Sequence, residues 1–569
     1  MTQRVLSLFL AGLLLVPGAC RTTPPAASYD LLIRNGQVHD GSGGPARAVD
    51  IAVRGDRVVA LLPPGSDATA SRVVDAGGLA VAPGFINVLS WAGESLIADG
   101  RGLSDTKQGV TLEIFGEGWS MGPLSPAMKE RAQKDQGDIR YPIAWNSLGQ
   151  YLEHLEQRGV TPNVASFVGA TTVRIHELGE DDVQPTPTQL AAMQQRVREA
   201  MGEGALGVGA SLIYAPASYA RAGELIALAR AAAESGGGYV AHMRSEANGL
   251  EQALEETVAI ARATGRHAEV YHLKAAGEAN WPKMARAIAT IESARAQGVD
   301  IAANMYAYPA GATGLDASIP PWVQAGGREA LNGRLRDPAV RQRVIAEMKD
   351  PDAGWENLRL QAGSADRVLF IGFRSQALKP LTGKTLAQVA QMRGTPVEDT
   401  VLDLMLEDDS RVDTAYFLMS EENVELGLRQ PWVSLGSDAE SSAPEGVFLK
   451  ASTHPRAYGN FARFLGHYVR DRRLVPLEEA IRRITRLPAQ HWQLRDRGCL
   501  APGCYADLVV FDPATIRDNA TFEKPLTLAS GVRDVFVNGV QVLRDGEHTG
   551  AKPGRVVRGP GWSGWAKAR

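Results

Sequence analysis

The stretch GGYVAHMRSEANGLEQALEETVAIARATGRHAEVYHLKAAG, residues 237–277, decides the fold. It begins with a short apolar run at 237–242 and ends with another at 267–272, and the segment 249–263 between them has apolar residues at helical spacing. Two short buried runs joined by an amphipathic helix are typical of parallel strands with a crossover helix. The stretch therefore predicts an α/β fold built on a parallel sheet.

The same alternation of apolar runs and helical segments extends through the middle of the chain. Eight parallel strands alternating with helices fit a closed (β/α)8 barrel of the TIM type. The interval 309–415 is too long for one crossover, so we expect a helical insertion there that covers part of the barrel mouth. The expected strands are 82–90, 110–116, 163–169, 205–212, 237–242, 267–272, 300–308 and 432–438.

Both flanks of the chain differ from the middle. Residues 29–81 and 496–561 consist of short β-like runs separated by Gly and Asp, as hairpins require. We therefore predict one small β-sandwich domain assembled from both termini, with the barrel and its insertion occupying 82–495.

The overall charge argues against one large class of partners. Lys and Arg total 60 against 64 Asp and Glu, so the net charge is −4, whereas a nucleic-acid-binding protein shows a basic excess. A hydrophobic content of 44% with 22% charged residues is that of a globular chain rather than a disordered one. We expect a large α/β enzyme with a small-molecule substrate and no nucleic-acid partner.

The first 20 residues, MTQRVLSLFLAGLLLVPGAC, have the layout of a signal peptide, with Arg4, an apolar run to Val16 and then small residues. The run is too short to span a bilayer comfortably. Cys20 follows Pro-Gly-Ala, which resembles a bacterial lipobox, so we predict an exported, periplasmic protein anchored by a lipid on Cys20. Cleavage nearby and release is the alternative. Residues 21–28 are then a flexible tether.

Two further cysteines, Cys499 and Cys504, flank a Pro-Gly pair near the C-terminus. An exported protein reaches an oxidising compartment, which permits a disulfide between them. Two small buried residues are the alternative, and the sequence leaves the choice open.

Four side chains that can bind a metal or move a proton lie at the ends of predicted strands: Glu117, His242, His272 and Asp438. In a barrel of parallel strands the C-terminal strand ends meet at one rim, where catalytic residues collect. A single strand histidine is more often a hydrogen-bonded core residue. Four such residues at four strand ends nevertheless predict a transition-metal site.

Several segments resemble the D-aminoacylase (N-acyl-D-amino-acid deacylase) branch of the amidohydrolase superfamily, from about residue 29 to residue 561. The resemblance implies a metal-bearing barrel with a small β domain, and a hydrolase acting on carbon–nitrogen bonds other than peptide bonds. The matching segments are VAPGFI, EGALGVGASLIYAP, AHMRSE, YHLKAAGEANWPK, LGSDAE, HPRAYGNFARFLG, GCLAPGCYADLVVFDP and PGRVVRGPG.

The chain departs from that family in the first strand, where members have two metal-binding histidines. Leu89 and Trp91 occupy those places and cannot bind a metal. Glu117 stands where the family uses a cysteine ligand, and the bridging lysine found elsewhere in the superfamily is absent. The set Glu117, His242 and His272 therefore predicts one zinc ion per chain rather than two.

The resemblance also implies roles for residues around that ion. Asp438 is the expected general base that takes a proton from water, with capping of a following helix as the alternative. Arg456 is expected to bind the substrate carboxylate through its planar guanidinium. Tyr214 and Tyr308 match positions that line the family's substrate pocket, with ordinary aromatic packing as the alternative.

The leading hypothesis is a metal-dependent amidohydrolase that cleaves the amide of an N-acyl-D-amino acid or a related linear amide. The second is hydrolysis of a cyclic amide or a dipeptide, as in other amidohydrolases. The third is a lipoprotein without catalysis that only binds a solute or a metal. The sequence leaves open the acyl chain, the amino acid, the identity of the metal and the oligomeric state.

Overall fold

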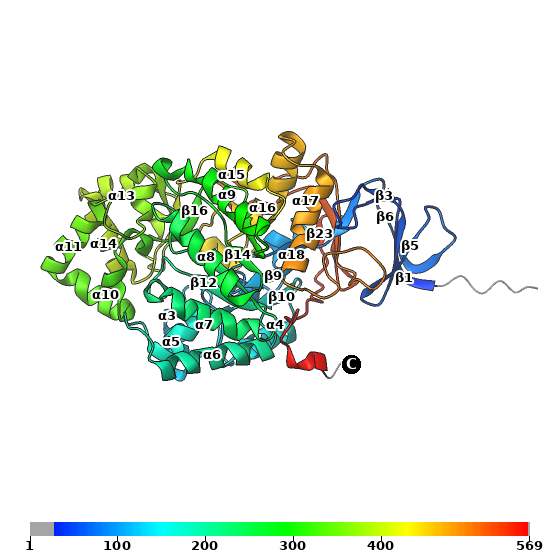
Figure 1. Ribbon diagram of the computed structural model, residues 1–569. Coiled ribbons are helices and arrows are strands. Elements are labelled where there is room, and N and C mark those ends of the chain that lie inside the picture. The colour runs from blue at the N-terminus through cyan, green and yellow to red at the C-terminus, as the bar shows by residue number, and fades with distance from the viewer. Residues whose placement is uncertain (1–27, 567–569) are drawn as a thin grey trace, which may run out of the picture.

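The computed structural model describes residues 28–566 (Figure 1). The predicted signal peptide, Cys20 and nearly all of the predicted tether lie outside these residues. Within the described part of the chain, no helix is long and apolar enough to cross a membrane. The first strands of the chain lie at one end of the molecule, and helices α10 (Gly327–Arg336) and α11 (Pro338–Lys349) lie at the other.

Each of the eight runs predicted in the middle of the chain contains a strand, and neighbours in sequence pair in parallel. The run 163–169 is interrupted at Phe167, so it forms two short strands with different neighbours. The strands are β8 (Phe85–Asn87), β9 (Val110–Phe115), β10 (Asn163–Ser166) with β11 (Val168–Gly169), β12 (Gly207–Ser211), β13 (Gly238–His242), β14 (Ala268–Val270), β15 (Ile301–Met305) and β19 (Val433–Leu435).

The first and last of these strands are also neighbours. The backbone N–H of Val88, just after β8, donates to the carbonyl of Leu435 in β19 (3.4 Å), and that of Asp438 donates to Leu89 (2.9 Å). Ser90 and Ala439 form a parallel bridge one step further on. Since all the pairings between these strands are parallel, their C-terminal ends lie together at the same end of the strands.

The helices between these strands pack against them through one apolar face. Helix α8 (Leu250–Thr264) buries Leu250, Leu254 and Val258, which follow one another at intervals of four residues and so lie on one face. Gly265 ends this helix with φ at 63°, a left-handed conformation that glycine adopts without strain. The other long helices of this kind are α4 (Leu148–Arg158), α6 (Pro187–Gly202), α7 (Ala222–Ala233) and α9 (Lys283–Ala296).

The sequence predicted a helical insertion between β15 and β19. The insertion that the structure shows is only partly helical. It contains helices such as α13 (Leu386–Arg393) and α14 (Val397–Asp408), but also a three-stranded antiparallel sheet of order β16-β18-β17. Short apolar runs such as VLFIG cannot be distinguished from buried helix by periodicity, which explains the error. These strands are β16 (Gly311–Gly314), β17 (Val368–Gly372) and β18 (Asp413–Tyr416).

Strands from both termini form the β domain. A seven-stranded sheet has the order β23-β22-β21-β20-β7-β2-β3, in which β7 (Ala80–Pro83) pairs antiparallel with β20 (Leu508–Phe511). A second sheet, β5-β4-β1-β6, comes from the N-terminal segment alone, and the two share one apolar core. The remaining strands are β1 (Ser28–Arg34), β2 (Gln37–Val38), β3 (Arg47–Ala48), β4 (Asp50–Arg54), β5 (Arg57–Leu62), β6 (Thr69–Asp75), β21 (Val532–Val537), β22 (Val540–Arg544) and β23 (Glu547–His548).

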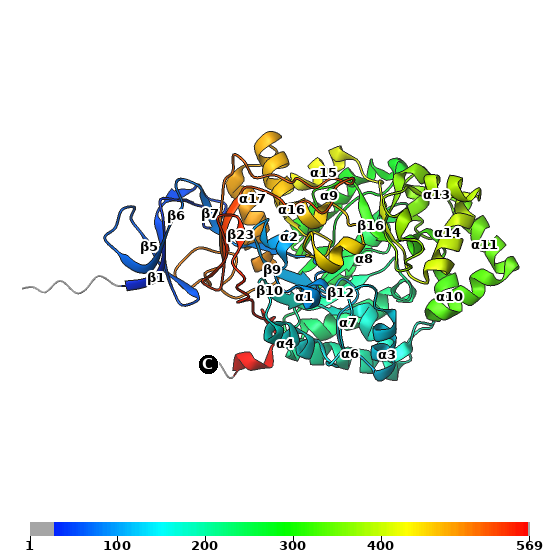
Figure 2. The same ribbon diagram turned by 180° about the vertical axis from the view of Figure 1, so that it is seen from behind.

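The last part of the segment 496–561 does not belong to the β domain, which corrects the predicted boundary. The N–H of Gly554 donates to Val160, Val556 forms a parallel bridge with Val164 of β10, and the N–H of Gly559 donates to Gly204. Seen from either side, the C-terminus lies close to α4 (Figure 2). The tail has the sequence pattern of a strand because its backbone lies extended along the parallel strands. Pairing with those strands satisfies its N–H groups.

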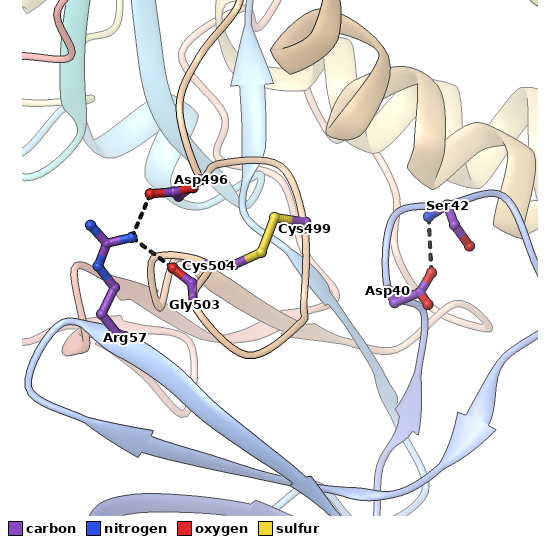
Figure 3. The surroundings of a disulfide bond; sticks show 7 residues. All are labelled: Asp40, Ser42, Arg57, Asp496, Cys499, Gly503 and Cys504. Atoms are coloured by element: carbon purple, nitrogen blue, oxygen red, sulfur yellow. Dashed lines mark hydrogen bonds and ion pairs between the residues drawn. A yellow bond between two sulfur atoms is a disulfide. The ribbon is translucent and has the colours of Figure 1, made fainter.

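Cys499 and Cys504 form a disulfide, so the choice left open by the sequence is resolved (Figure 3). Both residues are buried at the edge of the β domain. The same turn is held from outside by Arg57, which donates to the carboxylate of Asp496 (3.0 Å) and to the carbonyl of Gly503 (2.7 Å). The disulfide thus closes a loop that already packs against the N-terminal strands.

Candidate metal centre and active site

Three side chains that can bind a metal meet at the C-terminal ends of three strands. Glu117 follows β9, His242 is the last residue of β13, and His272 follows β14. Glu117 Oε1 lies 3.1 Å from His242 Nδ1 and 3.0 Å from His272 Nε2. All three side chains are buried, and their ligand atoms lie within 4.8 Å of one another. The structure therefore brings the predicted ligand set together.

The donor atoms of this group fit a divalent transition metal. His242 Nε2 is buried and has no hydrogen-bond partner among the described residues. His272 Nδ1 lies 2.9 Å from Glu246 Oε1, so a carboxylate contacts that ring on the side away from Glu117, as behind many metal-binding histidines. Lys274 Nζ lies 2.6 Å from the same oxygen and 2.7 Å from His272 Nδ1. Two imidazoles and one carboxylate form a competent zinc ligand set.

The surroundings of Glu117 keep its carboxyl ionised. Burial alone would raise the pKa of Glu117, but the charges and hydrogen bonds of His272 and His242 outweigh burial and hold the pKa well below its usual range. The ionised carboxylate is the form that binds a metal.

Asp438 lies beside this group, just after β19. Its Oδ2 forms an ion pair with Arg456, whose Nη2 lies 2.9 Å away, and its Oδ1 accepts from Trp91 Nε1 at 3.1 Å. Burial raises the pKa of the Asp438 carboxyl although Arg456 opposes the shift, and the charge of Glu117 adds to the rise. Residues 439–445 contain no helix, so Asp438 is not the helix cap of the alternative interpretation.

Trp91 occupies one of the two places in the first strand where the sequence offers no metal ligand. Its indole N–H lies 3.1 Å from Glu117 Oε2 and 3.1 Å from Asp438 Oδ1, so it is shared between the two carboxylates. Leu89, at the other place, is 1% exposed and packs in the core beneath the site. An N–H donor and an alkyl side chain cannot bind a metal, so neither residue adds to the ligand set.

Arg456 begins helix α16 (Arg456–Arg463) and is almost fully buried. Besides its contact with Asp438, its Nε and Nη1 atoms are buried without a partner among the described residues. The guanidinium carbon lies 4.5 Å from the ring centre of Tyr306. A buried guanidinium with unsatisfied N–H groups is costly, and a bound carboxylate would satisfy them.

The two tyrosines predicted to line the site differ in their placement. The Tyr214 ring lies 5.2 Å from the His242 ring, so this residue borders the metal ligands. Tyr308 does not contact them, because its hydroxyl donates to Asp518 at 3.1 Å. Tyr306 is the aromatic residue of that segment that reaches the site, with its ring 6.3 Å from that of His272. The structure thus places Tyr306, rather than Tyr308, beside the metal ligands.

Several side chains of this site had no role assigned from the sequence. They follow strand ends, where the backbone leaves the two-residue period and side-chain direction is set by tertiary contacts. A polar residue close behind a histidine ligand is the one available signal, and it applies to one of the three. The side chains are Trp91, Lys274 and Tyr306.

Comparison with known proteins agrees with this fold and donor set. Residues 72–543 match the model described as the amidohydrolase family. The chain belongs to this family, and within it to the D-aminoacylase branch. It is 34% identical over 530 residues to a D-aminoacylase of Alcaligenes xylosoxydans xylosoxydans, covering 93% of this chain and 97% of that protein.

Two solved structures show the same likeness in three dimensions. One is an N-acyl-D-glutamate deacylase from Bordetella bronchiseptica complexed with zinc and a phosphonate inhibitor, with 30% identity, a TM-score of 0.77, and 94% and 100% of the two chains covered. The other is a D-aminoacylase described with a binuclear metal centre, with 32% identity, a TM-score of 0.77, and 93% and 100% covered. The α/β fold of the chain is thus that of the solved D-aminoacylases.

Proposed function

We propose that the protein is a metal-dependent amidohydrolase that cleaves the amide bond of an N-acyl-D-amino acid. The observation that carries this proposal is the convergence of Glu117, His242 and His272 beside Asp438 and Arg456, which joins a metal ligand set, a base and a carboxylate-binding cation. The relatives support the same reaction. The match to a D-aminoacylase covers 93% of this chain, and the match to an N-acyl-D-glutamate deacylase covers 94%.

We further propose that the eight parallel strands close as a (β/α)8 barrel with the site at its C-terminal rim. The hydrogen bonds between the segments that follow β8 and β19 support closure. The two sheets at the other end form the small β-sandwich domain, whose shared apolar core supports that description.

We assign one zinc ion to the active site, held by Glu117, His242 and His272. When bound there, zinc supplies the Lewis-acid chemistry that activates a water molecule and polarises a carbonyl group. The indole of Trp91 and the alkyl chain of Leu89 support a single ion, because a second one would lack the ligands that the first strand provides in the family. The D-aminoacylase with a binuclear centre is described with activation by one metal and attenuation by the second.

Side chains of the site carry out proton transfer and bind the substrate. Asp438 takes the proton of the attacking water on its carboxylate and passes it to the nitrogen of the departing amine. One carboxyl can thus serve in turn as base and as acid. Arg456, whose Nε and Nη1 have no partner among the described residues, binds the substrate carboxylate and thereby orients the amide. Tyr214 borders the substrate beside His242.

A side-by-side assay of N-acetyl-D-amino acids, their L-enantiomers, dipeptides and hydantoins tests the function. We expect turnover of the D-series, lost on chelation and regained with Zn²⁺. Turnover confined to hydantoins or dipeptides would favour the second hypothesis. Bound zinc without turnover of any amide would favour a solute-binding protein instead.

Arg456→Lys is expected to lower kcat/KM for an N-acyl-D-amino acid by about 10- to 100-fold, mainly through KM. The lysine keeps the charge but loses the planar pair of charge-assisted hydrogen bonds, each worth ~1.5–3 kcal/mol. The steady-state parameters check this, with Arg470→Lys as a control whose residue pairs with Asp471 on the surface. An unchanged KM would show that another group binds the carboxylate.

We also propose that the protein is exported and held at a membrane by a lipid on Cys20. The signal-like residues 1–20 and the Cys499–Cys504 disulfide, a bond typical of oxidising compartments, support export. Cys20→Ser is expected to move the protein from the membrane fraction to the soluble fraction of cells that express the full chain. Equal partition of parent and variant would exclude the lipid anchor.

A further inference from the structure

A second group of histidine and carboxylate side chains lies at the opposite ends of the strands. Glu269 belongs to β14, His267 directly precedes that strand, and His491 ends helix α18 (Arg486–His491). His272 follows the C-terminal end of the same strand, so the two groups lie at opposite ends of β14. We call His267, Glu269 and His491 the floor cluster. Their ligand atoms lie within 4.8 Å of one another.

The distances in the floor cluster fit a metal better than hydrogen bonds. Glu269 Oε2 lies 3.4 Å from His267 Nε2 and 3.4 Å from His491 Nδ1. Good N–H···O hydrogen bonds are about 2.7–3.2 Å long. Atoms bound at about 2.0–2.1 Å to a tetrahedral zinc lie about 3.3–3.4 Å from one another. The oxygen thus lies at the separation of neighbouring ligands from each of the two nitrogens.

The outer contacts of the cluster hold two of its side chains from outside. His267 Nδ1 lies 2.8 Å from Asp300 Oδ1, so the other ring nitrogen, Nε2, is the one that faces Glu269. The other oxygen of Glu269 accepts from Asn304 Nδ2 (2.7 Å) and from Ser434 Oγ (3.3 Å). These contacts occupy the atoms that face away from the cluster, which is how the neighbours of metal ligands act.

Burial of the cluster leaves one polar atom unsatisfied. Glu269 is fully buried and His267 is 6% exposed. His491 Nδ1 is buried without a hydrogen-bond partner among the described residues, although it faces the Glu269 carboxylate. A buried imidazole nitrogen without a partner costs free energy, and a metal ion would use its lone pair.

We propose that His267, Glu269 and His491 bind a divalent transition-metal ion, zinc in the first place, at a structural site distinct from the active site. Two imidazoles and a carboxylate suit zinc, with water in the fourth position. The ligands come from β14 and from α18, the helix that precedes the C-terminal part of the β domain. The ion would therefore fasten this helix to the N-terminal end of the barrel, where ordered residues contribute to stability rather than chemistry.

Zinc analysis of the full-length His242→Ala variant tests this site apart from the active site. After incubation with Zn²⁺ and dialysis, we expect about two zinc ions in the parent, one in His242→Ala, and none in His242→Ala combined with His491→Gln. Added Zn²⁺ should also raise the melting temperature of stripped His242→Ala, and not that of the double variant. The proposal is overturned if His242→Ala binds no zinc, which would leave the floor cluster as a hydrogen-bonded group only.

Two further measurements separate this proposal from the proposed function. His491→Gln alone should lose one zinc ion while its turnover stays within a few-fold of the parent, because among the described residues no hydrogen bond or ion pair joins His491 to the active-site group. A parent without amide turnover whose His242→Ala variant still binds zinc would refute the function and support the floor site. If His491→Gln does not fold, the zinc content of His242→Ala still decides the question.

Discussion

Turnover of an N-acyl-D-amino acid is expected to fall by at least ~10⁴-fold in His242→Ala, because this variant removes one of three ligands of the active-site ion. A bound metal lowers the pKa of water from about 15.7 to ~7, and this activation is lost with the ion. His242 is buried at the end of β13, and its Nδ1 lies 3.1 Å from Glu117. Steady-state kinetics and zinc content, measured on the same sample, check the result.

The control for this variant is His467→Ala, since His467 lies outside the site and its Nε2 is 3.7 Å from Glu421. It should keep the zinc content and turnover of the parent. Zn²⁺ in excess should restore neither property to His242→Ala. A variant that keeps turnover within tenfold of the parent would show that His242 is not a ligand of the reacting metal.

The parallel strands in the middle of the chain are predictable because parallel strands buried on both faces are continuous apolar runs. In β9 all six residues of VTLEIF are buried, including Thr111 and Glu113, so burial extends even beyond the apolar ones. Helix α8 is predictable for the opposite reason, because only one of its faces is buried. Local burial pattern therefore determines most of the element order.

The elements that could not be predicted depend on partners far away in the sequence. Strand β16 has the sequence GATG, which shows neither period nor bulk, and it is a strand only because β18 pairs with it. The tail near Val556 alternates like a strand of the β domain, yet its partner is Val164 of β10. Pairing across such distances leaves no local pattern to read.

The residues of the candidate site were likewise predictable only where the strand pattern places them. The strand ends Glu117, His242, His272 and Asp438 are predictable because parallel strands bring their C-terminal ends to one rim. The choice between Tyr306 and Tyr308 depends on side-chain direction beyond β15, which no period determines. Likewise the floor residues on β14 share a face at a spacing of two, but His491 is brought to them by α18.

Asp438→Asn is expected to lower kcat by about 10²–10⁴-fold while KM changes little, because general acid–base catalysis supplies an effect of that size. The amide is nearly isosteric with the carboxylate, and its one oxygen can accept from either Trp91 or Arg456, so the fold should be kept. The zinc content should also be kept, since Asp438 is not among the three ligands. Kinetics and zinc analysis of the purified variant measure all three quantities.

Asp496→Asn provides the matched control, because this carboxylate pairs with Arg57 on the surface of the β domain. It should leave kcat unchanged, so that any loss in Asp438→Asn is assigned to the site. An Asp438→Asn variant that hydrolyses N-acyl-D-amino acids within a few-fold of the parent would make this carboxylate a structural partner of Arg456. A loss of zinc together with turnover would instead place Asp438 among the metal ligands, and the base would then have to be another group.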